Sequence, residues 1–311
     1  MEEFSVKYLP KLKNIAYANP RAPLVGLTFM VPVIVYLALF FIYPLVFNIS
    51  LGFQDMDAIS FVTGDSAFAG LSNYQSLFSS RTFRLAIRNT IIWTTFSLVF
   101  QFGIGFALAL YFNREFPGEK VLRGLLLIPW FLPLIVTANA FKFFFSGQGI
   151  INGLLVTAGI TGTPVNWLTD PNLAIWTLTF VNIWIGIPFN FILLQAGLKE
   201  IPAEMHEAAA VDGANWWQRL LFVTVPCLKP VMSTVLMLGI VYTIKHFDIV
   251  WITTQGGPAN STHLLSTLSY QLAFREYHFG LGSAVANLMV LIILILVSVF
   301  SLFARMRGDN V

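Results

Sequence analysis

Long runs of apolar residues recur along the chain, and charged residues fall mostly between them. An α-helix rises about 1.5 Å per residue, so roughly 20 apolar residues cross the ~30 Å hydrocarbon core of a membrane. Six runs reach that length; formal charges occur only near the end of the third, at Lys142, and within the fifth. The predicted spans are residues 24–47, 89–112, 124–145, 173–197, 230–254 and 284–304. The pattern predicts an all-α integral membrane protein with six transmembrane helices.

Composition supports the same class. Of the 311 residues, 57% are hydrophobic and only 11% are charged, about half the charged share of a soluble domain, which excludes a water-soluble fold. The single cysteine, Cys227, forbids an internal disulfide and cannot by itself build a metal site. A net charge of +3 would suggest a nucleic-acid partner in a soluble chain, but in a membrane protein the positions of the charges matter more than their sum, and no nucleic-acid partner is expected.

The positions of the basic residues predict the orientation. Six spans place both termini on one side of the membrane, and twelve of the eighteen Lys and Arg residues fall on that side, which is expected to be cytoplasmic. The cytoplasmic set is Lys7, Lys11, Lys13, Arg21, Arg114, Lys120, Arg123, Lys199, Arg219, Lys229, Arg305 and Arg307. Arg81, Arg84, Arg88, Lys142 and Arg275 are assigned to the opposite side, with the three arginines at 81–88 on a long external loop.

The N-terminal segment, residues 1–23, is charged throughout and lacks a cleavage site after a short apolar core, so no secretory signal is expected. Residues 73–83 fit either a short helix on the outer surface or a loop packed on neighbouring helices. Pro129 and Pro133 in the third span, together with Pro32 and Pro188, are expected to bend helices or interrupt their hydrogen bonding.

The loop between the fourth and fifth spans carries the most informative pattern. Pro202 can open a helix, and Glu204 and Glu207 suit the positive end of its dipole. Gly213 can end that helix, and a second one is expected from residue 216 until Pro226 restricts its continuation. The loop therefore predicts a helical elbow exposed to the cytosol.

The first helix of this elbow is rich in alanine. Small side chains at Ala203, Ala208 and Ala210 allow it to lie deep in a groove of another protein, with Glu207 and Asp212 as anchors. An ordinary amphipathic connector is the alternative, because alanine-rich helices are common. Residue pattern alone leaves both open.

The spacing within this loop resembles a known family. Glu207-Ala208-Ala209, then three residues, Gly213, nine residues and Val223-x-Val225-Pro226 resemble the EAA loop of binding-protein-dependent ABC importer permeases, whose usual ending is Ile-x-Leu-Pro. Gln195-Ala196-Gly197-Leu198 before the loop and Thr254-Gln255-Gly256-Gly257-Pro258 after the fifth span are similar to the carbohydrate-uptake branch of that family. The resemblance covers roughly residues 84–305.

The resemblance implies a type I ABC permease (MetI-like) fold and a division of the chain. Residues 1–23 would be a cytoplasmic tail, 24–83 the first transmembrane helix plus an external loop, 84–305 the permease core with a coupling loop at 198–228, and 306–311 a second cytoplasmic tail. It also implies that Glu207, Ala208, Ala209, Asp212 and Gly213 form a coupling helix docked on an ATP-binding subunit.

The partners implied by the resemblance carry the remaining chemistry. They are a second homologous permease subunit, a dimer of ATP-binding subunits, an extracytoplasmic solute-binding protein, a carbohydrate-like solute and membrane lipid. No G-x-x-x-x-G-K-[ST] phosphate loop occurs in the sequence, so ATP and Mg are expected in the partner ATPase and no cofactor in this chain. The chain is thus expected to be a transport subunit of the cell inner membrane, not an enzyme.

Ionisable residues within a span are functional candidates because their burial in a membrane is costly. Lys245, His246 and Asp248 qualify, and the three-residue spacing of Lys245 and Asp248 would also permit a self-neutralising pair on one helix face. Helical spacing places Gly239, Tyr242 and His246 on one stripe.

By resemblance to maltose-type permeases, Gly186, Phe189, Gly239, Tyr242, Thr243 and His246 are expected to line the solute pathway. Phe189 and Tyr242 could stack on sugar rings while Thr243 and His246 hydrogen-bond, although helix packing would equally explain the two aromatics. The maltose-type pattern has asparagines at the positions of Thr243 and His246, so the identity of the sugar is left open. A disaccharide, an oligosaccharide, a polyol or a glycerol phosphate would fit.

Two rival functions are weighed against an importer permease. An ion-coupled secondary transporter would use membrane-embedded acids, and Asp248 is the only acid deep in a predicted span. A membrane enzyme would need clustered His, Asp or Glu at membrane depth, and no second span supplies partners for His246 and Asp248. The His-Glu-x-x-His motif of a zinc protease is also incomplete, because Ala210 stands where the second histidine would be. Both rivals leave the Glu207-Ala208-Ala209 loop unexplained.

Overall fold

The computed structural model describes residues 22–306, and the side chains of 28–302. The predictions for the two tails lie outside the described residues, apart from their innermost positions. The chain divides into two compact units, residues 1–50 and 51–311. Within the described residues, five helices are long and apolar enough to cross a membrane, and a bent helix pair gives a sixth candidate. The helical, six-span class predicted from the sequence is confirmed.

The first unit is one apolar helical rod. It comprises α2 (Ala22–Leu37), the π-helical turn η1 (Ala38–Ile42) and α3 (Tyr43–Leu51), which runs just past its boundary. Pro32 is accommodated inside α2. In η1 the Tyr43 amide donates to the Ala38 carbonyl, five residues back, so the rod continues through a wider turn.

The second unit opens with a small two-stranded and helical segment. Strands β1 (Gln54–Asp55) and β2 (Ala67–Phe68) pair antiparallel around α4 (Ala58–Thr63), which is capped by the Asp57 carboxylate. The next helix, α5 (Ser72–Ser79), is held by Asn73, whose Nδ2 donates to the carbonyls of Gly52 and Gln54. Residues 73–83 therefore contain a short helix, which was one of the two structures predicted for this segment; the other was a loop.

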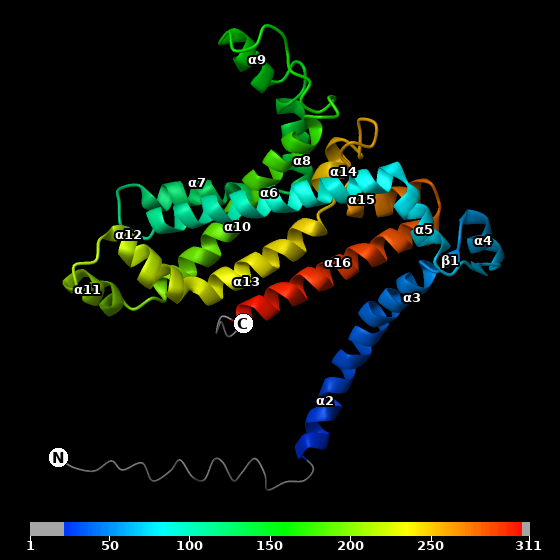
Figure 1. The fold of residues 1–311 in the computed structure, drawn as a ribbon, viewed down its shortest axis with the longest axis horizontal. Helices are drawn as coiled ribbons and strands as arrows, with labels where there is room; N and C mark the ends of the chain where they lie inside the picture. The colour runs from blue at the N-terminus through cyan, green and yellow to red at the C-terminus, as the bar shows by residue number, and fades with distance from the viewer. Residues whose placement is uncertain (1–21, 307–311) are drawn as a thin grey trace. The chain divides into compact units, whose positions relative to one another are not determined.

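Four long helices of this unit run alongside one another in Figure 1: α6 (Arg81–Tyr111), α10 (Ala174–Lys199), α13 (Val225–Ile244) and α16 (Phe279–Met306). Helix α6 packs against both α10 and α13, and α13 packs against α16. Helix α6 begins eight residues before the predicted span because Ser80 caps it, its Oγ accepting from the Phe83 amide. Arg81, Arg84 and Arg88 therefore lie on its first turns, and their assignment to an external loop is wrong.

The third predicted span is two helices. Helices α7 (Glu119–Phe131) and α8 (Leu134–Phe144) meet at 97°. Pro133 causes the break, because it has no amide hydrogen and holds Leu132 in an extended conformation. Helices α7 and α10 continue through Pro129 and Pro188. The short helix α9 (Ile150–Thr157) follows α8.

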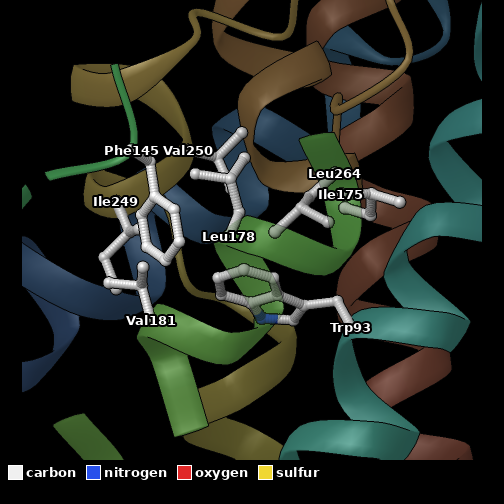
Figure 2. Close-up of a cluster of buried hydrophobic side chains, with 8 residues drawn as sticks. All are labelled: Trp93, Phe145, Ile175, Leu178, Val181, Ile249, Val250 and Leu264. Atoms are coloured by element: carbon white, nitrogen blue, oxygen red, sulfur yellow. The ribbon is translucent and has the colours of Figure 1, made fainter. Parts of the chain in front are cut away.

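The remaining elements surround the end of the bundle where α6 starts. Helix α14 (Asp248–Thr253) follows α13 after a break, and α15 (Leu265–Tyr270) runs into the π-helical turn η3 (Gln271–Arg275). Figure 2 shows the buried side chains that join α6, α8, α10 and α14 here. They are Trp93, Phe145, Ile175, Leu178, Val181, Ile249, Val250 and Leu264. This cluster fixes Trp93 beside the point where α13 ends.

Candidate solute cavity and coupling helix

A cavity of about 280 Å³ lies between α6, α7, α10 and the end of α13. Its lining consists of Gln101, Trp130, Asn182, Ile185, Gly186, Phe189, Asn190, Gly239, Tyr242, Thr243 and His246. All six residues predicted for the solute pathway are in this set. Two of them are glycines: a Cβ at Gly186 would meet the Gln101 amide and a Cβ at Gly239 would meet Leu98, so these glycines let α6 pack closely at the cavity wall.

Aromatic rings form one wall. The rings of Phe189 and Tyr242 meet edge to face, with centroids 5.9 Å apart and planes at 85°, and Trp130 lies 6.3 Å from Phe189. Tyr242 is half exposed, so its ring is accessible as well as packed. The Lys245 ammonium lies 4.7 Å from the Tyr242 centroid, a cation–π contact on the same ring.

Three amide side chains supply polar groups that the sequence analysis missed. Gln101 on α6 donates from Nε2 to the Asn182 carbonyl at 2.8 Å, and Asn182 donates from Nδ2 to the Ser97 hydroxyl at 2.8 Å. Asn190 donates to the Gly186 carbonyl at 2.9 Å. These bonds fix the orientation of amides that also border the cavity. The sequence feature that could have identified these three residues is an amide side chain within an otherwise apolar predicted span.

His246 reaches the cavity by a different route from the one predicted. Helix α13 ends at Ile244, so His246 lies beyond it and does not extend the stripe of Gly239 and Tyr242. Its backbone amide donates to the Thr243 carbonyl at 3.3 Å, which turns the chain back toward the helix. The His246 Nε2 atom is buried and has no hydrogen-bond partner within residues 28–302. It is therefore an unsatisfied polar atom of a residue that lines the cavity.

Lys245 and Asp248 do not form the predicted pair on one helix face. The break at 245–247 separates them, with Lys245 ending α13 and Asp248 opening α14. Both are exposed, and no ion pair joins them in the described part of the chain. Asp248 instead lies in the first turn of α14, where the helix dipole favours a carboxylate.

The predicted elbow is present at the far end of the bundle. Helix α11 (Ala203–Val211) buries none of its residues, and Glu207, Ala208, Asp212 and Gly213 are exposed, with Ala209 half-buried. The helix ends in a Schellman motif, because the Ala214 amide donates to the Ala209 carbonyl and the Gly213 amide to the Ala210 carbonyl. Gly213 has a φ of +81°, the left-handed conformation that this motif requires.

Pro226 does not end the second helix of the elbow, contrary to prediction. Helix α12 (Trp216–Arg219) passes into the π-helical turn η2 (Leu220–Thr224) and then directly into α13. In η2 the Val225 amide donates to the Leu220 carbonyl, so the wider turn accommodates the proline at the start of α13.

The Thr254–Pro258 segment is fixed by a buried histidine. Gly256 has a φ of +85°, and a Cβ there would lie about 2.1 Å from the His263 ring. His263 Nδ1 is 3.2 Å from the Thr267 hydroxyl, and Asn89 on α6 donates to the His263 carbonyl. Burial lowers the pKa of His263 to about 4, only partly opposed by the charge of Glu276. His263 lies outside the membrane-spanning helices.

Comparisons with known proteins decide the family. The sequence signature of binding-protein-dependent transport system inner membrane components matches residues 101–307. The chain belongs to this family. It is 32% identical over 295 residues to the trehalose/maltose transport system permease protein MalF of Thermococcus litoralis, covering 93% of this chain and 96% of that protein. It is 31% identical over 278 residues to the lactose transport system permease protein LacF of Rhizobium radiobacter, covering 87% and 91% respectively.

A solved structure supports the fold. A bacterial ABC transporter involved in the import of the acidic polysaccharide alginate includes a chain with a TM-score of 0.77 and 22% identity, covering 95% of this chain and 99% of that one. The present chain is therefore a multi-pass inner-membrane permease subunit of an ABC importer. It is not an enzyme, since ATP hydrolysis in this family belongs to a separate ATPase partner.

Proposed function

We propose that this chain forms half of the translocation pathway for a carbohydrate or related solute, and that the solute passes the 280 Å³ cavity. The convergence of an aromatic wall, oriented amides and an unpartnered imidazole in one hollow carries this proposal. The names of the relatives, transporters of trehalose/maltose and lactose, favour the same solute class.

The chemistry of the cavity suits a sugar. Sugar rings have apolar faces that stack on aromatic rings, so Phe189 and Tyr242 are the proposed stacking residues. Hydroxyl groups both donate and accept hydrogen bonds, and His246 Nε2 and Thr243 offer such groups. Gly186 and Gly239 let Gln101 and Leu98 of α6 pack closely against this wall, and the Gln101 amide is thereby placed at the cavity.

The proposed importer contains further subunits. A second homologous permease would complete the pathway, an extracytoplasmic solute-binding protein would deliver the solute, and a dimer of ATP-binding subunits would bind ATP and Mg. The exposed helix α11 is the proposed coupling helix, with Glu207, Ala208, Ala209, Asp212 and Gly213 at the contact. Closure of the ATPase dimer would move α11 and turn the cavity outward.

The proposed orientation places both termini in the cytoplasm, because twelve of the eighteen basic residues then lie on that side. In this arrangement α11 faces the cytoplasm, and the Thr254–Pro258 segment faces the opposite side. Residues 84–305 would form the permease core, preceded by the first transmembrane helix and its external loop.

A solute panel tests the proposal. The importer would be purified with its neighbouring subunits, reconstituted in vesicles, and supplied with labelled disaccharides, oligosaccharides, polyols, glycerol phosphate and amino acids. We expect ATP-driven uptake of at least one carbohydrate and a weaker apparent affinity in Phe189→Ala and Tyr242→Ala. Phe180→Ala is the matched control, because Phe180 is exposed on α10 away from the cavity lining. Uptake confined to amino acids would contradict the solute class.

A further inference from the structure

A second hollow lies away from the solute cavity, among residues at the end of α6 and in the α11–α12 loop. Figure 1 shows these elements at the same end of the bundle. The volume of this hollow is about 530 Å³. The residues around it come from the end of α6, the end of α10, α11, α12 and η2: Ala107, Leu110, Tyr111, Asn113, Arg114, Leu198, His206, Trp216, Arg219, Leu220 and Thr224. No acidic side chain is among these residues.

Two arginines give this hollow a positive charge without a partner. In the part of the chain that the structure describes, neither Arg114 nor Arg219 forms an ion pair. The Arg219 Nε atom is buried and makes no hydrogen bond to any described residue. A guanidinium presents several N–H donors in a plane that matches phosphate or carboxylate oxygens. The hollow is therefore suited to an oxyanion.

An apolar groove of about 570 Å³ adjoins this hollow, and Tyr111 lines both. The other groove residues are Leu108, Phe112, Leu122, Leu125, Leu126, Ile128, Pro129, Trp184, Ile187 and Pro188, from α6, α7 and α10. A free phosphate or a nucleotide has no hydrocarbon chain to bury against this apolar surface. A ligand with a charged head and a hydrocarbon chain would fill both spaces.

Exposed aromatic residues indicate the depth of the hollow. Trp216 and Tyr111, which line the hollow, are 42% and 59% exposed, and the ring of Trp217, which is 65% exposed, packs edge to face on Trp216. Tryptophan and tyrosine gather at the level of lipid headgroups, where one end of the ring is apolar and the other is wet. The arginines therefore lie where a membrane presents its phosphates.

We propose that this site binds an anionic phospholipid, with its phosphate between Arg114 and Arg219 and one acyl chain along the adjoining groove. The assignment to the cytoplasmic leaflet rests on the orientation proposed above. The site connects the end of α6 to α11 and α12, since His206 and Trp216 line it. A bound lipid would contact α6, α11 and α12 at once and so stabilise the position of the α11–α12 loop relative to the bundle.

Lipid retention by the complete importer tests this site. The delipidated complex would be incubated with phosphatidylcholine vesicles containing phosphatidylglycerol, re-isolated, and its bound lipids measured by native mass spectrometry. We expect wild type to retain phosphatidylglycerol, and Arg114→Gln and Arg219→Gln each to weaken retention about fivefold, because each basic residue near an anionic surface contributes a comparable attraction. Leu125→Asn in the apolar groove is expected to weaken retention without altering the charge.

The control removes the same charge nearby. Lys120→Gln with Arg123→Gln leaves the hollow intact, because neither residue lines it, and retention should be unchanged. Equal retention in wild type and the Arg114→Gln/Arg219→Gln double variant would overturn the proposal. Arginine-dependent binding of labelled inorganic phosphate in vesicles of phosphatidylcholine alone, with phosphatidylglycerol not retained, would also overturn it. ATP-driven uptake by the same wild-type preparation tests the proposed function separately.

Discussion

Trp93 donates a hydrogen bond from its indole Nε1 to the carbonyl oxygen of Thr243 at 3.1 Å, and both residues are buried. Thr243 lies in the last turn of α13, and the ring of Trp93 is 5.6 Å from that of His246. A residue of α6 thus fixes the place where the fifth span breaks and where two predicted pathway residues meet the cavity.

Replacement of Trp93 should destabilise this junction. Trp93→Phe removes the indole donor and part of a fully buried ring, at an expected cost of about 1 to 3 kcal/mol. The midpoint of thermal unfolding of the purified complex should fall by several degrees. Trp217→Phe, at an exposed position, should leave the midpoint unchanged. Equal midpoints for the two variants would show that the contact does not support the fold.

A methyl group at position 186 should reduce transport. A Cβ on Gly186 would lie about 2.3 Å from the Gln101 amide, which must then give up its bond to the Asn182 carbonyl and move into the cavity. Such overpacking costs about 1 to 3 kcal/mol, so Gly186→Ala should weaken the apparent affinity for the transported sugar roughly tenfold.

Gly103→Ala is the control for this change, because Gly103 lies on α6 and a Cβ there meets no atom within 4 Å. Uptake by Gly103→Ala should match wild type in apparent affinity. If Gly186→Ala transported as well as Gly103→Ala, the cavity would not be on the solute path.

The end of α11, the proposed coupling helix, should tolerate only residues that adopt a left-handed backbone. A Cβ at Gly213 meets nothing within 4 Å, so the constraint is its φ of +81° and not space. Gly213→Val should cost about 1 to 2 kcal/mol of strain and unwind the end of α11, whereas Gly213→Asn should be tolerated. ATPase stimulation by the solute-loaded binding protein should fall severalfold in the first variant only. Equal ATPase stimulation in Gly213→Val and Gly213→Asn would show that coupling does not depend on the left-handed backbone at this position.

Acid should destabilise the end of the bundle that holds the Thr254–Pro258 segment, through His263. The pKa of this residue is about 4 in the folded chain against an ordinary 6.5, so between these values the unfolded chain binds a proton that the folded chain does not. The contribution of neutral His263 to stability is complete above pH 6.5 and declines as the pH falls toward 4. The unfolding midpoint of His263→Phe should depend less steeply on pH than wild type in that window. If the unfolding midpoints of wild type and His263→Phe changed equally with pH, His263 would not be the source of the acid sensitivity.

Local sequence signals predicted the helices and the coupling elbow well. Gly213 determined the end of α11, and Pro133 determined the break between α7 and α8, because each acts through its own backbone. Pro226 was misjudged because a π-helical turn five residues long relieves its clash, and no residue type announces such a turn.

The tertiary arrangement of the cavity was harder to predict. The six predicted pathway residues do lie around one hollow, while their contact with solute stays a prediction. Gln101 and Asn182 were missed because their relation depends on the register of α6 against α10, which the spacing within either helix does not encode. The same limit applies to Lys245 and Asp248, since the helix ends before it can bring them together.

The most direct test of the account is uptake of labelled carbohydrate by vesicles that contain the complete importer and its binding protein, with and without ATP. We compare wild type with Glu207→Lys on α11 and with Glu200→Lys, an exposed residue just outside it. An ATP-driven importer should show ATP-dependent uptake that Glu207→Lys abolishes and Glu200→Lys preserves, with assembly verified by pull-down. Uptake that continues without ATP, follows an ion gradient and ignores Glu207→Lys would contradict ATP-driven import in favour of a secondary transporter.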